Sequence, residues 1–135
     1  MEEISIPKVT VRDSGQKGRG LFATQDFKKG DLVLGWNDNN KYLSESEVEQ
    51  LSEEEKRYVA IYNNKYLLIA DPERYMNHSC DPNTKTENGL DYALRDIKEG
   101  EEITGDYELE GSLLGFECKC GSENCRKVVH AKKVV

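Results

Sequence analysis

Short apolar runs, separated by glycine and charged residues, set the pattern of this chain. β-Branched, leucine and aromatic residues cluster or alternate in runs that predict short strands, at residues 9–11, 32–34, 66–69, 92–94 and 102–104. Residues 26–31 (Asp-Phe-Lys-Lys-Gly-Asp) and 96–101 (Asp-Ile-Lys-Glu-Gly-Glu) read alike, and each ends one strand and begins another. We interpret them as one kind of turn used twice, without duplication of a domain.

One stretch, residues 44–61, has a helical pattern. Ser44 and Ser52 are each followed three residues later by glutamate, which is the pattern of a capping box and predicts two short helices or one broken helix. A loose apolar stripe accompanies them, made of Val48, Leu51, Val59 and Ile61. The many glutamates of this stretch predict a solvated face. Together the patterns predict a mainly β protein with short helices, an α+β fold.

Length and charge narrow the class of protein. A chain of 135 residues fits one domain with a moderate core, and no apolar run approaches the roughly 18 residues of a membrane span. The net charge of −7 argues against direct binding to a nucleic-acid backbone, which requires a basic face. It is compatible with a basic substrate such as a lysine-rich segment, and equally with a charge that only maintains solubility.

The four cysteines fall in two places. Cys118, Cys120 and Cys125 form a Cys-x-Cys-x4-Cys cluster, and Cys80 lies in the polar segment 77–83. Zinc prefers four soft ligands in a tetrahedron, and three cysteines of one tight loop need a fourth ligand from elsewhere. If Cys80 supplies it, the metal would hold the C-terminal tail against the polar segment as two walls of one site.

Two disulfides and four free thiols are the alternatives to a metal. The N-terminus has neither the basic nor the apolar region of a signal peptide, which predicts an intracellular, cytoplasmic protein. A reducing compartment favours metal over disulfides, and the short spacing of the last three cysteines disfavours unrelated thiols.

Three polar motifs carry candidate chemistry, although each also fits an ordinary structural role. Gly18-Arg19-Gly20 allows a ligand to approach the backbone closely, but most such sequences are only turns. Asn77-His78 offers a reactive imidazole or a hydrogen-bonded loop. Asp106-Tyr107 follows a predicted strand and is either its end or part of a site. Their joint occurrence in one order favours a functional site.

In this order the motifs resemble those of the SET-domain protein lysine methyltransferases. Residues 18–23 (Gly-Arg-Gly-Leu-Phe-Ala) look like the first motif of that family. Residues 74–83 (Arg-Tyr-Met-Asn-His-Ser-Cys-Asp-Pro-Asn) resemble its Arg-Phe-x-Asn-His-Ser-Cys-x-Pro-Asn motif, and residues 100–107 (Gly-Glu-Glu-Ile-Thr-Gly-Asp-Tyr) resemble Gly-Glu-Glu-Leu-x-x-Asp-Tyr. The cysteine cluster looks like the post-SET zinc cluster.

The resemblance covers about residues 7 to 128. It is closest to the short, free-standing members, with a SET domain at residues 1–110 and a post-SET zinc-binding tail at residues 111–135. It implies a fold of small curved sheets with a knot-like crossing of the Asn77 loop and the Tyr107 segment. It also implies transfer of a methyl group from S-adenosylmethionine to a lysine of a protein, a histone or another basic protein, without a nucleic-acid or membrane partner.

Residue roles follow from the resemblance by position. Tyr107 is the catalytic tyrosine, and Tyr66 and Gly105 belong to the substrate channel. The cofactor-binding residues are Gly18, Arg19, Gly20, Arg74, Asn77 and His78. The zinc ligands are Cys80, Cys118, Cys120 and Cys125. A lysine, with a pKa of about 10.4, must lose a proton before it attacks, and a tyrosine of pKa about 10 is better suited to orient the amine than to act as a simple base.

Two features depart from the family pattern. Gly105 stands where the family often carries phenylalanine or tyrosine, so it is expected either to widen the channel for more than one methyl group or to serve a backbone with positive φ. After Cys125 the tail offers no aromatic residue to pack on cofactor and substrate. Residues 36–64 match no motif and are the expected place of substrate choice.

Two other classes of protein remain open. One is a zinc-stabilised binding module that keeps the fold without turnover, and the other is a structural zinc protein without a cofactor. Asn77, His78 and Tyr107 together favour an enzyme, because a binding module has no need of the tyrosine. Titration with S-adenosylmethionine tests the structural class, and methyl transfer to a peptide separates enzyme from binding module.

Overall fold

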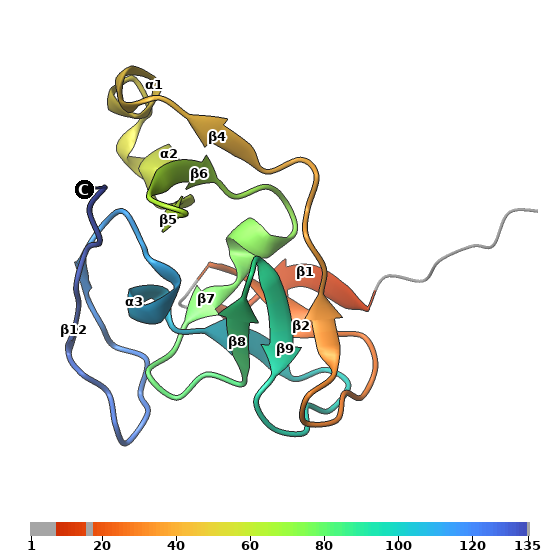
Figure 1. Ribbon diagram of the computed structural model, residues 1–135. Coiled ribbons are helices and arrows are strands. Elements are labelled where there is room, and N and C mark those ends of the chain that lie inside the picture. Colours follow the sequence, from red (N-terminus) through yellow and green to blue (C-terminus); the bar gives the residue numbers. More distant parts are fainter. Residues whose placement is uncertain (1–7, 16–17, 135) are drawn as a thin grey trace, which may run out of the picture.

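The computed structural model describes residues 8–15 and 18–134, which form small sheets joined by short helices and turns (Figure 1). Among these residues, one sheet has the order β1 (Val9–Asp13), β2 (Arg19–Ala23), β10 (Glu102–Gly105), β7 (Asn77–His78). A second has the order β3 (Leu32–Leu34), β9 (Leu90–Ala93), β8 (Thr84–Glu87). A third has the order β4 (Lys41–Leu43), β6 (Lys65–Leu68), β5 (Val59–Tyr62), and the last pairs β11 (Phe116–Glu117) with β12 (Val128–Val129). The expected mainly β fold and all five predicted strands are confirmed.

Short helices complete the fold. They are α1 (Glu45–Glu49), α2 (Glu53–Lys56), α3 (Tyr107–Glu110) and the 3₁₀ turn η2 (Glu73–Tyr75). Figure 1 shows α1 and α2 with the β4–β6–β5 sheet at one end of the molecule, and the C-terminal segment with β12 on the side opposite β1. No helix in the described part of the chain is long and apolar enough to cross a membrane.

Both predicted capping boxes are present. The side chains of Ser44 and Ser52 each accept a hydrogen bond from the backbone N–H of the glutamate three residues on. Each glutamate side chain in turn accepts one from the backbone N–H of its serine. The placement of Val59 and Ile61 on a helical stripe is wrong. They lie in β5, where they are buried and alternate with the less buried Ala60 and Tyr62. Pairing with β6 decides this, because it buries the same apolar residues at a period of two.

The main core lies under the first two sheets. Leu21 in β2 and Ile103 in β10 are opposite each other in the register and fully buried. Around them pack buried residues from neighbouring strands and turns, namely Val9, Ala23, Phe27, Val33, Met76, Ala93 and Ile97. Strand β10 is therefore held rigidly, and it carries the chain into Asp106 and Tyr107.

The two similar turns pair with each other. Phe27 and Ile97 form an antiparallel bridge with backbone N···O distances of 2.7 and 2.8 Å. The aspartate of each turn also accepts a hydrogen bond from the backbone of the other turn. Lys29 N–H donates to Asp96 Oδ1 at 2.9 Å, and Glu99 N–H donates to Asp26 Oδ1 at 2.8 Å. The repeated sequence thus reflects one kind of turn used twice, as predicted, and the structure adds that the two turns contact each other.

Strand β7 joins β10 in parallel, with Asn77 beside Thr104 and His78 beside Gly105. The segment after β7 is clamped by Asn83, which is buried. Its side-chain amide donates to Glu102 O at 2.8 Å and its Oδ1 accepts from Thr104 N–H at 2.9 Å. This arrangement brings the Asn77 loop next to the Tyr107 segment. The complete knot-like threading of the two stays a prediction.

Candidate active site

Tyr107 begins α3 directly after β10. Asp106 caps the helix, with its Oδ1 accepting from Glu108 N–H at 3.1 Å. The backbone N–H of Tyr107 donates to His78 Nδ1 at 3.0 Å, and its hydroxyl donates to the carbonyl oxygen of Met76. Burial of the hydroxyl, followed by the charge of Glu110, raises its pKa above the ordinary value. Tyr107 is therefore a fixed, protonated hydroxyl and unsuited to act as a base.

His78 connects this tyrosine to the cysteine cluster. Because Nδ1 accepts from the Tyr107 backbone, the neutral ring carries its proton on Nε2, which lies 3.3 Å from Cys80 Sγ. The His78 ring packs edge-on against Tyr107 and Phe116, with each pair of centroids 5.6 Å apart. Phe116 was not predicted as a site residue. The prediction from sequence considered only the residues after Cys125, which include no aromatic residue, and overlooked this ring two residues before Cys118.

The glycine turn meets the Asn77 side chain. Asn77 Nδ2 donates to Arg19 O at 3.0 Å and to Glu102 Oε2 at 2.8 Å. A Cβ at Gly20 would fall 2.7 Å from Glu102 Oε2 and 3.2 Å from Asn77 Nδ2, so only glycine leaves room for these bonds. Three of the predicted elements, namely Gly18–Gly20, Asn77 and His78, are thus brought together around β7 and β10.

Two cavities share the Tyr107 wall. The larger, of ≈ 610 Å³, is lined by Asn77, His78, Phe116 and the first cysteines of the tail. The smaller, of ≈ 120 Å³, has a lining rich in aromatic and acidic side chains. Tyr107, Arg57 and Ser112 line both. Tyr107 therefore lies at the boundary between a space for a large ligand and a space for a slender one.

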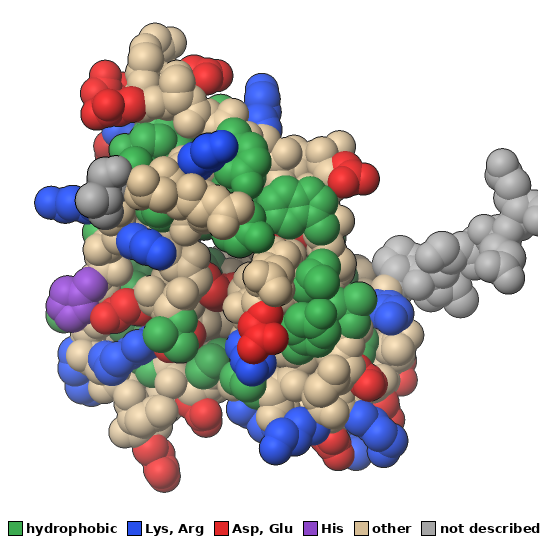
Figure 2. All heavy atoms as spheres, in the orientation of Figure 1, with side chains coloured by type: hydrophobic (Ala, Val, Ile, Leu, Met, Phe, Trp, Pro, Cys, Tyr) green, Lys and Arg blue, Asp and Glu red, His purple; other side chains and the backbone are tan. Residues whose placement is uncertain are grey.

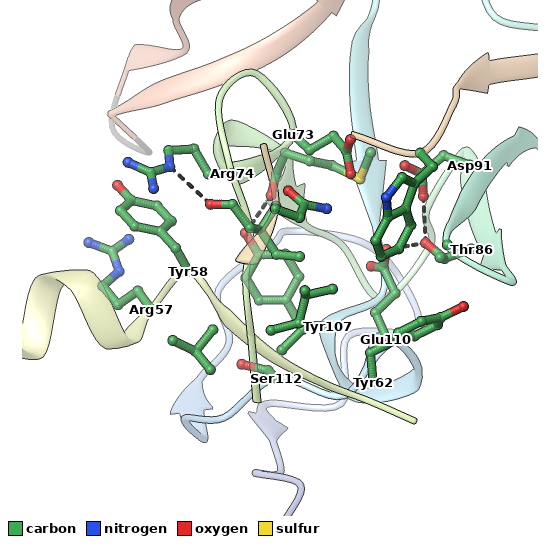
Figure 3. A pocket seen from close by; sticks show the side chains of 18 residues that line it. Arg57, Tyr58, Tyr62, Glu73, Arg74, Thr86, Asp91, Tyr107, Glu110 and Ser112 are labelled. Atoms are coloured by element: carbon green, nitrogen blue, oxygen red, sulfur yellow. Dashed lines mark hydrogen bonds between the residues drawn. The ribbon is translucent and has the colours of Figure 1, made fainter. Parts of the chain in front are cut away.

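The smaller cavity has two unlike sides (Figure 3). Arg57, Tyr58 and Arg74 lie on one side of Tyr107, and Arg74 Cζ is 4.7 Å from the Tyr58 ring centroid. Glu73, Asp91, Thr86 and Glu110 lie on the other. Several residues of the 36–64 segment line this cavity, including Trp36, Asn40, Tyr58 and Tyr62. The segment without a recognisable motif thus contributes much of its wall.

Burial favours the protonated form of the acids on this side of the cavity. Burial raises the pKa of Glu110 to about 8, of Glu73 to about 7 and of Asp91 to about 6, and the nearby Asp91 carboxylate adds to the first two shifts. The outer face in Figure 2, in contrast, shows Lys and Arg interspersed with Asp and Glu.

We expect these acids to make stability fall as pH rises. An acid whose folded pKa exceeds its unfolded pKa binds more protons in the native state, so its stabilisation is present below the unfolded value and lost through the folded value. For Glu110 this window runs from 4.5 to about 8. Glu110→Gln should remove this dependence, which is on the order of 5 kcal/mol across the full window. Urea unfolding at several pH values measures it, and equal pH slopes for both proteins would contradict it.

Tyr66 and Arg74 lie apart from the places that their predicted roles imply. Tyr66 lies outside the lining of the smaller cavity, because alternation in β6 directs Leu67 and Ile69 into it. Tyr58 and Tyr62 line it instead. Arg74 lines this cavity and donates to Ile69 O at 3.1 Å, so it stands apart from Asn77 and His78. Its role in cofactor binding stays a prediction.

Gly105 differs from one of the two expectations for it. It lies in β10 and is absent from the glycines with positive φ in the described chain, so the backbone does not require glycine. The space beside it is not empty either. A Cβ there would fall 2.4 Å from Glu110 Oε2 and 2.9 Å from Met76 Sδ. The Glu110 side chain therefore takes up the space beside Gly105, and the width of the channel at this position stays a prediction.

The four cysteines converge beside His78. Their Sγ atoms all lie within 4.8 Å of one another, and Cys80 and Cys118 Sγ are 3.8 Å apart. Tetrahedral zinc with Zn–S bonds of about 2.3 Å requires S···S distances of roughly 3.8 Å. No disulfide joins the four, and the cluster fits a four-thiolate metal site. The predicted grouping of Cys80 with the tail cysteines is confirmed.

Polar contacts join the tail to the Tyr107 segment as well. Arg126 donates to Asp106 Oδ1 at 2.6 Å, and its backbone N–H points to Cys80 Sγ at 3.3 Å. Asn124 Nδ2 donates to Cys80 O at 3.1 Å, and His130 Nδ1 lies 3.1 Å from Glu108 Oε1. Asp106 thus orders α3 and holds the tail at once. The sequence offered no signal for the Asp106–Arg126 pair.

Comparison with known proteins agrees with this geometry. Residues 18–108 match the family model "SET domain". The chain is 34% identical, over 88% of its length, to the human "Histone-lysine N-methyltransferase, H3 lysine-36 specific". It is 30% identical, over 95% of its length, to the "Variant-silencing SET domain-containing protein" of Plasmodium falciparum. It spans only 5% and 6% of these relatives, respectively.

A solved structure supports the fold. The methyltransferase domain of human histone-lysine N-methyltransferase SETMAR superposes with a TM-score of 0.69 at 20% identity, covering 93% of this chain and 58% of that one. With the family match, the paired cavities and the cysteine cluster, the chain belongs to the SET-domain family of protein lysine methyltransferases.

Proposed function

We propose that this chain transfers a methyl group from S-adenosylmethionine to a lysine side chain of a basic protein, such as a histone, in a reducing intracellular compartment. The observation that carries the proposal is the position of Tyr107 between the two cavities. A methyl donor on one side and an amine on the other would meet at this wall. Relatives named as histone-lysine methyltransferases support the substrate class.

The larger cavity suits the methyl donor. Its lining combines an aromatic ring, Phe116, with the cations Arg57 and Lys119 and the polar groups of Asn77 and His78. An adenine ring can pack on Phe116 and a carboxylate can pair with a cation. When bound, S-adenosylmethionine supplies an electrophilic methyl group on a sulfonium. Gly18–Gly20 would contribute through Asn77, which binds the Arg19 carbonyl.

The smaller cavity suits a lysine. Its carboxyl oxygens would accept hydrogen bonds from the amine, and its aromatic side would surround the alkyl chain. The Tyr107 hydroxyl proton is engaged by Met76 O, so its oxygen lone pairs are free to accept an amine N–H and to orient the nitrogen. Exclusion of water beside the donor's cationic sulfonium would favour the neutral amine that attack requires.

Zinc is the proposed metal, held by Cys80, Cys118, Cys120 and Cys125. In the proposed division the SET domain ends at residue 110, and residues 111–135 form the tail that the metal organises. Phe116, Cys118 and Lys119 belong to this tail and also line the larger cavity. The metal would therefore shape the cofactor site without taking part in the reaction.

The proposal predicts methyl transfer onto a basic protein. Incubation with radiolabelled S-adenosylmethionine and a panel of histones should label a lysine, with calorimetric titration of the cofactor as a parallel measurement. Cofactor binding without label on histones or on a cell lysate would favour a binding module. Absence of cofactor binding by folded, zinc-loaded protein would contradict the proposal.

A further inference from the structure

Glu110 occupies the space beside Gly105 in the smaller cavity. The helix α3 carries Tyr107 at its first position and Glu110 at its last, so both side chains reach the same cavity from one turn. A Cβ on Gly105 would fall 2.4 Å from Glu110 Oε2 and 3.1 Å from Glu110 Cδ. Gly105 and Glu110, five residues later in the chain, thus form a compensating pair, in which the glutamate side chain fills the space that the glycine leaves.

The Glu110 carboxyl is held in this position. Thr86 Oγ1 lies 2.5 Å from Glu110 Oε1 and also 2.5 Å from Asp91 Oδ1 (Figure 3). The threonine has a single hydroxyl proton, so it donates to one carboxyl and accepts from the other, which must carry a proton itself. The raised pKa values of Glu110 and Asp91 agree with this shared proton. Gly111, with φ of 86°, ends the helix directly after Glu110.

We propose that Glu110 determines specificity in the wall of the lysine cavity, where its carboxyl limits the number of methyl groups that the enzyme adds. The inference rests on the proposed function and assigns its product. Each transfer breaks the S–C bond of the sulfonium donor, leaving a neutral thioether, and forms an N–C bond, giving a methylammonium. This methylammonium must lose a proton to solvent before a second transfer. A carboxyl in this space excludes the added methyl group and accepts the N–H that the unmethylated amine still carries.

Both effects act in the same direction. One methylene of space in an apolar pocket changes specificity by roughly 10-fold to 200-fold, and the loss of a matched hydrogen bond acts more strongly. The wild-type protein should therefore release mainly monomethyl-lysine. A larger or less polar space at Glu110 should allow the amine to turn back toward the methyl donor after the first transfer.

Product analysis of matched variants tests this specificity. Glu110→Ala removes volume and acceptor, and it should raise the ratio of di- and trimethyl-lysine to monomethyl-lysine by roughly 10-fold or more. Glu110→Gln keeps volume and an acceptor oxygen, and its product ratio should resemble that of the wild type. Mass spectrometry under excess S-adenosylmethionine measures the ratios. Equal ratios for the alanine variant and active wild type would overturn the inference while leaving the proposed function intact.

A stability cycle tests the occupied space without any activity. Gly105→Ala should lower the melting temperature, because the new Cβ collides with Glu110 Oε2 and Met76 Sδ. In the Glu110→Ala background the same change should cost less, with a departure from additivity of roughly 3 °C or more. If the melting-temperature changes of the two single variants simply add in the double variant, the inference that Gly105 and Glu110 form a compensating pair is overturned. Coupling in a protein that never transfers methyl would support the pair but refute the proposed reaction.

Discussion

Tyr107→Phe is expected to lower methyl transfer by roughly 100-fold or more, which is about 2.7 kcal/mol of transition-state stabilisation. The variant keeps the ring that packs against His78 and Phe116, with centroids 5.6 and 5.8 Å away, and removes only the hydroxyl. The hydrogen bond to Met76 O positions that hydroxyl so that its oxygen can accept a hydrogen bond from the amine N–H. Single-turnover kinetics with saturating cofactor and substrate measures the loss.

Two controls make this result specific. Affinity for S-adenosylmethionine should change little, because the hydroxyl lies against Met76, which lines the smaller cavity. Tyr66→Phe removes a tyrosine hydroxyl outside the cavity lining and should retain normal turnover. Near wild-type turnover in Tyr107→Phe would end the assignment of Tyr107. A similar loss of turnover in Tyr66→Phe would indicate that the loss in Tyr107→Phe comes from impaired folding.

Removal of zinc is expected to lower the melting temperature by about 10 °C or more and to abolish cofactor binding. Without the metal no bond joins the four cysteines, whose Sγ atoms lie within 4.8 Å of one another, and the tail that lines the larger cavity depends on this link. The core around Leu21 and Ile103 lies outside the cluster and should remain folded. Far-UV circular dichroism and limited proteolysis of chelated protein distinguish tail from core.

Restored zinc should restore cofactor binding, and metal analysis should give one equivalent per chain. Cys118→Ser should reproduce the effect of the chelator, because Cys118 is buried and its Sγ lies 3.8 Å from that of Cys80. Asn124→Ala is a matched control that removes a polar contact of the same loop to Cys80 O but keeps all four ligands. Fully active protein with well under one equivalent of zinc would contradict the metal site.

Features set by near neighbours in sequence could be predicted from the sequence. The capping boxes at Ser44 and Ser52 involve residues three positions apart, and both form as expected. The twin turns carry the same glycine and aspartate positions, which fold alike wherever they stand. The grouping of Cys80 with the tail was predictable because a tetrahedral metal demands a fourth ligand and no other cysteine exists in the chain.

Features set by packing across the chain needed the structure. Val59 and Ile61 are compatible with helix or strand, and only pairing with β6 selects the strand. The same pairing directs Leu67, and not Tyr66, into the cavity. The sequence by itself determined the family motifs and the residue types of the site. Tertiary structure alone decided that Thr86 holds Glu110 and that Arg126 joins Asp106, because these contacts arise between segments whose approach no local pattern encodes.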